Sequence, residues 1–83
     1  AKRETVQLKC TADMMKVIID RFDDDVQTKV VDGNHFIATV EVALSPNFYG
    51  WLFGFGDKIR LIAPGNVVEE YKALLKKELD NLL

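Results

Sequence analysis

Cysteine and histidine are almost absent from this 83-residue chain, which contains one of each. A single thiol, that of Cys10, cannot form an internal disulfide. One Cys and one His also cannot supply the four ligands of a structural zinc site. We therefore expect no bound metal, no cofactor and a reducing, cytoplasmic setting.

The chain also lacks a large excess of charge and a long apolar run. Eleven basic and thirteen acidic side chains give a formal net charge of −2, so the positive field that supports autonomous DNA binding is missing. No uncharged apolar run approaches the roughly 18 to 20 residues that a membrane span requires. These absences predict a domain that does not cross a membrane and does not bind duplex DNA by itself.

The residues that are present describe one globular domain over positions 1–83. Hydrophobic residues make up 48% of the chain and charged residues 29%, which is the balance of a folded domain. A chain of this size buries only about 60 to 65% of its unfolded surface, so a large interior active-site cleft is not expected. Because the first residue is Ala1 and not Met, we expect a fragment of a larger protein.

Alternation and helical spacing predict the elements of the first half. Apolar residues alternate over 5–10, which predicts a strand. Residues 11–22 predict a helix with Thr11 as its N-cap, ended by the acidic run 23–25. Segments 26–31 and 35–44 predict a hairpin around Asp32-Gly33-Asn34, where Asp-Gly favours positive backbone dihedrals. The helix is expected to bury one apolar stripe, formed by Met15, Ile18, Ile19 and Phe22.

The second half predicts a short helix, a strand and a longer final helix. Ser45-Pro46 is typical of a helix start, and Gly54 and Gly56 suit its exit. Alternation over 58–63 predicts the fourth strand. After Pro64-Gly65, Asn66 is expected to cap the last helix and Glu69 to complete a capping box. Its apolar stripe comprises Val68, Tyr71, Leu75, Leu79 and Leu82.

This order of elements predicts an α+β fold of the ferredoxin-like, split βαβ type with one added C-terminal helix. Because βαβ crossovers are right-handed, the helices should cover one face of a four-stranded antiparallel sheet. The other face is then open and net basic. Four cations on it are the predicted effector or anion site, unless they serve only solubility: Lys9, Lys29, Lys58 and Arg60.

The segment 51–64, with the helix that follows it, resembles a known family. Trp51 stands before a Gly-Phe-Gly-Asp turn, an alternating strand and a proline, and the matching positions are Trp51, Gly54, Phe55, Gly56, Asp57, Ile59, Leu61 and Pro64. This pattern is similar to the C-terminal extension, called WCX, of bacterial WYL-domain transcriptional regulators. The specific match covers about the last third of the chain; the earlier elements agree only in order.

The resemblance implies a parent regulator with partners in the same chain, a helix-turn-helix domain and a WYL domain. DNA contact would then belong to the helix-turn-helix domain. It further implies a non-enzymatic module for interdomain packing, dimerisation and effector sensing, with the effector unidentified. The alternative is a free-standing ferredoxin-like domain that binds a small molecule or single-stranded nucleic acid.

The residues that could carry chemistry favour binding over catalysis. No catalytic triad is visible, His35 follows a turn as a surface residue, and Cys10 is in phase with buried positions. The spacing of Trp51 predicts a core role where the short helix meets the fourth strand. Tyr49 and Phe53 fall on the other side of that helix and are predicted to form an exposed apolar interaction patch.

Overall fold

The structure is a computed structural model that describes residues 2–23 and 26–82. Asp24 and Asp25, which belong to the acidic run expected to end the first helix, lie outside these residues. Over the described ranges the elements are β1 (Lys2–Thr11), η1 (Ala12–Met14), α1 (Met15–Phe22), β2 (Gln27–Asp32), β3 (His35–Leu44), α2 (Pro46–Gly54), η3 (Gly56–Lys58), β4 (Ile59–Ala63) and α3 (Gly65–Leu82).

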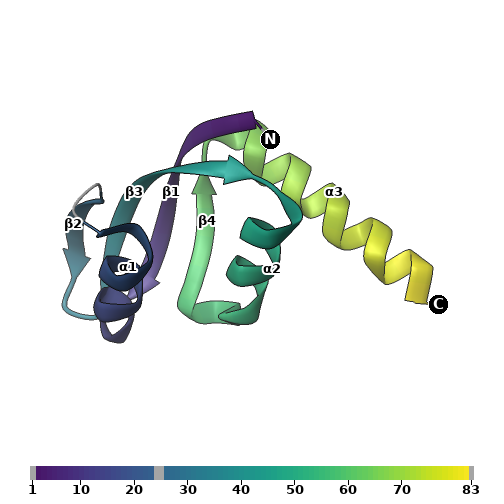
Figure 1. Cartoon of the computed structure of the whole chain (residues 1–83). Helices are drawn as coiled ribbons and strands as arrows, with labels where there is room; N and C mark the ends of the chain where they lie inside the picture. Colours follow the sequence, from purple (N-terminus) through teal and green to yellow (C-terminus); the bar gives the residue numbers. More distant parts are fainter. Residues whose placement is uncertain (1, 24–25, 83) are drawn as a thin grey trace.

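The four strands form one sheet in the order β2-β3-β1-β4, and every neighbouring pair is antiparallel. This is the strand order of a split βαβ arrangement, so the predicted α+β architecture is confirmed. Helices α1 and α2 lie on the same face of the sheet (Figure 1). Helix α3, the added C-terminal helix, begins at the end of β4 and extends away from the sheet (Figure 1).

The core lies between the sheet and the helices, and the predicted alternation is correct. The even-numbered residues from Val6 to Cys10 of β1 and from Phe36 to Val42 of β3 are buried, whereas their odd-numbered neighbours are partly or fully exposed. Helix α1 contributes Ile18 to this layer, α2 contributes Leu52, and α3 contributes Val67, each no more than 1% exposed. The buried strand residues are Val6, Leu8, Cys10, Phe36, Ala38, Val40, Val42 and Ile59.

Helix α1 is shorter than predicted, and it buries a different set of side chains. The segment after β1 first forms the 3-10 turn η1, and Thr11 makes no side-chain cap because its hydroxyl donates to the Asp13 carboxylate. This early turn buries Met14, while Met15 and Ile19 are 36% and 41% exposed. The predicted stripe was therefore wrong at those two positions, because tight winding at the start rotates the helix.

The β2–β3 hairpin forms, but not by the predicted backbone geometry. Among the described glycines only Gly56 has a positive φ, so the Asp32-Gly33 turn does not use the left-handed region. Instead, the Asp32 carboxylate accepts a hydrogen bond from the backbone N–H of Asn34 at 2.7 Å. Such side-chain capping by Asp stabilises a turn without positive dihedrals. Strand β2 is exposed along its whole length.

Helix α2 begins as predicted, and a glycine turn follows its end. Ser45 is the N-cap and its hydroxyl accepts from the backbone N–H of Phe48 at 3.3 Å, with Pro46 in the first turn. Gly56 has φ 57°, a conformation that favours glycine, and it lets the chain turn into β4.

Helix α3 starts one residue before the predicted cap. The carbonyl of Pro64 accepts from the backbone N–H groups of Val67 and Val68. Glu69, predicted for a capping box, instead pairs with Lys72 at 3.3 Å. Among the described residues, no helix is long and apolar enough to cross a membrane.

Candidate interaction surfaces

Trp51 joins the two helices that cover the sheet. Its ring meets Phe22 of α1 edge-on at a centroid distance of 5.6 Å, and it contacts Phe48 and Phe55 at 6.3 and 5.2 Å. The Arg21 guanidinium lies 5.4 Å from the ring centroid, within the range of a cation–π interaction. The predicted structural role agrees with this cluster, but Trp51 is half-buried at the α1–α2 contact, not buried against β4.

Tyr49 lies deeper than predicted. Only 6% of the residue is exposed, because its ring stacks on Tyr71 of α3 at a centroid distance of 5.2 Å and an interplanar angle of 11°. Burial, with Glu70 nearby, raises the pKa of the Tyr49 hydroxyl, and this hydroxyl has no hydrogen-bond partner among the described residues. The prediction that Tyr49 is exposed was therefore wrong; the stack instead fixes α3 against α2.

Phe53 is exposed as predicted, at 65%, and it forms one wall of an apolar groove between α2 and α3. The groove has a volume of about 670 Å³. Apart from Glu78, its lining is apolar or aromatic. We call it the α2–α3 groove, and its lining residues are Pro46, Tyr49, Gly50, Phe53, Tyr71, Leu74, Leu75, Glu78, Leu79 and Leu82.

The predicted apolar stripe of α3 has a partner in its own chain over only part of its length. Tyr71 packs against the core, as does Leu74, which the predicted stripe did not include. Leu75, Leu79 and Leu82 are 37%, 58% and 84% exposed. Exposure rises toward the C-terminus because the helix leaves the body of the domain (Figure 1). A contiguous apolar surface of this kind is typical of an interaction site.

The open face of the sheet carries three of the four predicted cations in one row. Lys9 of β1 lies opposite Ile37 of β3 on one side and opposite Arg60 of β4 on the other. Lys29 of β2 lies opposite Ile37. Residues directly opposite in a sheet share a face, so Lys29, Lys9 and Arg60 form a basic row across all four strands.

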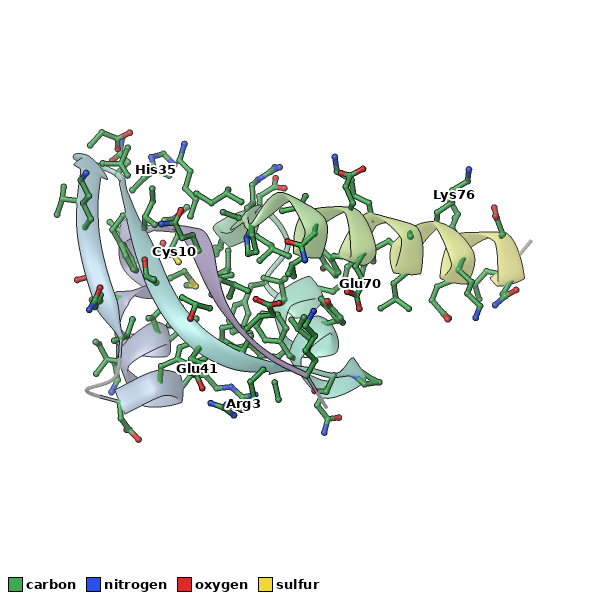
Figure 2. All side chains as sticks on the ribbon, turned by 90° about the horizontal axis from the view of Figure 1, so that it is seen from above. Arg3, Cys10, His35, Glu41, Glu70 and Lys76 are labelled. Carbon is green, nitrogen blue, oxygen red and sulfur yellow. The ribbon has the colours of Figure 1, made fainter. Side chains whose placement is uncertain are left out.

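The surroundings of this basic row differ from one cation to the next. Arg60 donates to Asp57 at 2.8 Å. Over residues 2–23 and 26–82, no carboxylate lies within ion-pair distance of Lys9 or Lys29, the ion pairs being Lys2–Glu4, Arg3–Glu41, Lys16–Asp20, His35–Asp32, Lys58–Asp13, Arg60–Asp57 and Lys72–Glu69. Glu41 forms an ion pair with Arg3, and the two residues lie next to each other in Figure 2.

Lys58 does not belong to the basic row, which corrects the prediction. It precedes β4 in the turn η3, and its ammonium group donates to the Asp13 carboxylate at 3.1 Å. The hydrogen bond from the Thr11 hydroxyl, followed by the contact with Lys58, lowers the pKa of Asp13. Lys58 therefore links the two turns at one end of the sheet and is not positioned to bind an anion on its open face.

The remaining residues of the motif have local structural roles. Gly54 is the last residue of α2, and Gly56 supplies the left-handed turn after it. Asp57 accepts from Arg60, and Pro64 separates β4 from α3 and accepts the first helical hydrogen bonds. The motif thus builds the connection from α2 through β4 to α3, which sets the direction of the projecting helix.

Neither candidate for nucleophilic or acid–base chemistry is placed in a reactive site. Cys10 is fully buried, as predicted, and burial raises the pKa of its thiol to about 11. His35 is half-buried at the hairpin, where its Nδ1 lies 3.0 Å from Asp32. No group of His, Cys, Asp and Glu side chains in the described part of the chain could hold a metal ion.

Three features of these surfaces were not singled out from the sequence. Leu74 and Gly50 line the α2–α3 groove, and Arg21 lies over the Trp51 ring. Leu74 precedes Leu75, so a wider stripe would have included it. Nothing in the sequence marks Gly50 or Arg21, because their importance arises from contacts between separate helices.

Fold and surfaces together define an α+β domain whose prominent surfaces are an apolar groove beside a projecting helix and a basic row on the open face of the sheet. The family model of the WCX domain matches residues 2–79, nearly the whole chain. The chain belongs to the WCX domain family, which confirms the resemblance seen in segment 51–64 and sets it in the context of WYL-associated transcription regulation. Searches of curated proteins and of solved structures returned no match.

Proposed function

We propose that this domain is a non-enzymatic C-terminal module of a WYL-type, helix-turn-helix transcriptional regulator that acts in the cytoplasm. The domain packs against other domains of its chain and contributes to dimerisation. The observation that carries this proposal is the apolar stripe of α3, whose members Leu79 and Leu82 are 58% and 84% exposed.

Leaving this stripe in water is costly. Burial of a leucine side chain is worth roughly 1.5 to 3 kcal/mol, and two leucines of α3, Leu79 and Leu82, are more than half exposed. The same stripe continues into the α2–α3 groove, so a partner that covers one also fills the other. A regulator that binds DNA as a dimer gains such a contact from each copy.

Dimerisation is tested by introducing charge on the stripe and measuring the oligomeric state of the chain by sedimentation equilibrium. Leu79→Glu should shift the chain toward monomer, since it places a carboxylate in the apolar contact. Asn81→Glu is the matched control, because Asn81 is exposed on the same helix and does not line the groove. A wild-type chain that stays monomeric at near-millimolar concentration contradicts dimerisation by this domain.

Effector sensing is the second candidate function, and the register of the basic row favours it. Neighbouring strands are about 4.8 Å apart, so Lys9 and Arg60 can converge on one oxyanion, Arg60 with a planar fork and Lys9 with a point charge. Lys29 lies two strands from Lys9 and extends the row. We propose that this row binds a phosphate-bearing effector.

The test combines Lys9→Glu with Arg60→Glu and titrates the chain with pyrophosphate and, separately, with a single-stranded oligonucleotide. Binding to wild type that is lost in the double variant supports the site, and the two probes distinguish a small effector from a nucleic acid. Lys16→Glu with Lys76→Glu is the control, because it makes the same change in net charge away from the row. Equal binding by both double variants would mean that the basic row is only a solvated surface and not a binding site.

A further inference from the structure

Gly50 occupies the middle of α2 although nothing among the described residues requires a glycine there. Its backbone does not adopt the positive φ that favours glycine, which among the described glycines is found only at Gly56. A Cβ added to Gly50 would meet no heavy atom within 4 Å. Neither backbone conformation nor packing inside the domain therefore explains this residue.

A glycine at this position has a cost. In a helix interior it is less favourable than alanine by about 0.5 to 1 kcal/mol, because the unfolded chain has more freedom to lose. Gly50 also lines the α2–α3 groove, between Pro46 and Phe53 on the same face of α2. The absent side chain leaves a notch on that face, open to the groove.

We propose that α3 of a second copy crosses α2 at Gly50, with a leucine of its stripe seated in this notch. The inference rests on the proposed dimerisation and specifies which helices meet and where. The distance between packed helices depends on the side chains at their contact, and glycine permits the closest approach.

The second copy is the partner that fits, because this chain carries both complementary halves of the contact. The α2–α3 groove requires an apolar helix, and α3 presents one. At 1.5 Å per residue α3 is about 27 Å long and α2 about 14 Å, so α3 reaches well past its own partner helix. Figure 1 shows this free end beyond the rest of the domain. A two-fold axis would satisfy both copies at once.

A small apolar ligand is the competing occupant, since a groove of about 670 Å³ is within the range of ligand sites. The groove lining extends from Pro46 in the first turn of α2 to Leu82 at the end of α3, where Leu82 is 84% exposed. A second helix covers the whole stripe, and for that reason we favour it.

The experiment compares Gly50→Ala, Gly50→Leu and the control Gly54→Ala in the same chain. Gly54 is also in α2, and its added Cβ also meets nothing within 4 Å, but it does not line the groove. Sedimentation equilibrium gives the dimer dissociation constant, and urea denaturation gives the midpoint of unfolding of each variant.

We expect Gly50→Leu to weaken the dimer by about tenfold or more, equivalent to about 1.4 kcal/mol, while its unfolding midpoint at monomeric concentrations does not fall. Gly50→Ala should weaken the dimer less and raise that midpoint. If Gly50→Leu fails to fold, the inference is tested by comparing the dimer dissociation constant of Gly50→Ala with that of Gly54→Ala.

This inference would be overturned if Leu79→Glu disrupts the wild-type dimer but the dimer dissociation constants of both Gly50 variants stay within about twofold of that of Gly54→Ala. The proposed dimerisation would still stand. A wild-type chain that stays monomeric would overturn both. Recovery of the purified chain as a monomer with a bound small molecule would also overturn the inference.

Discussion

Removing the Trp51 side chain should destabilise the domain through the loss of the α1–α2 contact. Truncation of a fully buried Trp to Ala costs about 3 to 5 kcal/mol, and Trp51 is only half-buried. Each of its aromatic contacts with Phe22, Phe48 and Phe55 adds about 0.5 to 1.5 kcal/mol beyond area burial. Weighing partial exposure against these contacts, we expect Trp51→Ala to lower the free energy of unfolding by about 2 to 3 kcal/mol.

That loss is large for a domain of this size, whose total stability is on the order of 4 to 12 kcal/mol. Urea denaturation followed by circular dichroism is the suitable assay, because the variant no longer contains its only tryptophan. Phe53→Ala is the matched control: it removes another aromatic ring from α2, but one that is 65% exposed. Its effect on monomer stability should stay below about 1 kcal/mol.

A loss below about 1 kcal/mol for Trp51→Ala, equal to that of the control, would refute the reasoning. It would mean that α1 and α2 are held to the sheet independently and that the aromatic cluster contributes little. Trp51→Phe refines the result. It retains a ring against Phe22 and Phe55 and should recover part of the lost stability.

Three further predictions concern titration and binding. The Cys10 thiol, buried and with its pKa raised to about 11, should react with a thiol reagent at pH 8 only as fast as the domain opens; rapid reaction of the folded chain would place it at the surface. The pKa values of Asp13 and Asp32 are lowered in the fold, Asp13 mainly by the Thr11 hydroxyl and Lys58, and Asp32 by the Asn34 N–H and His35. The stability they contribute is present above the ordinary carboxyl pKa and lost as the pH falls through the lowered values, so Asp32→Asn should flatten the acid limb of the unfolding midpoint against pH. Finally, the isolated chain should not bind duplex DNA at physiological salt, since its net charge is −2; micromolar binding with a steep salt dependence in a fluorescence titration would contradict this.

The sequence by itself determined the strands and their buried faces. Side chains alternate strictly along a strand, so the phase of Val6 and Leu8, or of Phe36 and Val40, follows from their polarity alone. Local chemistry likewise determined the start of α2 at Ser45-Pro46. The residues of segment 51–64 also carried enough of the family pattern to point to the WCX domain, because that pattern is contiguous in the chain and does not depend on contacts between distant elements.

The tertiary structure decided which surfaces are free. Lys58 looked like a member of the basic row, but a 3-10 turn placed it against Asp13. Tyr49 looked exposed until α3 brought Tyr71 against its ring. In both cases the partner is distant in sequence, and helical or strand periodicity carries no information about contacts between elements. The direction of α3, and with it the groove at Gly50, depends on how the chain turns between α2, β4 and α3, which only the packed structure reveals.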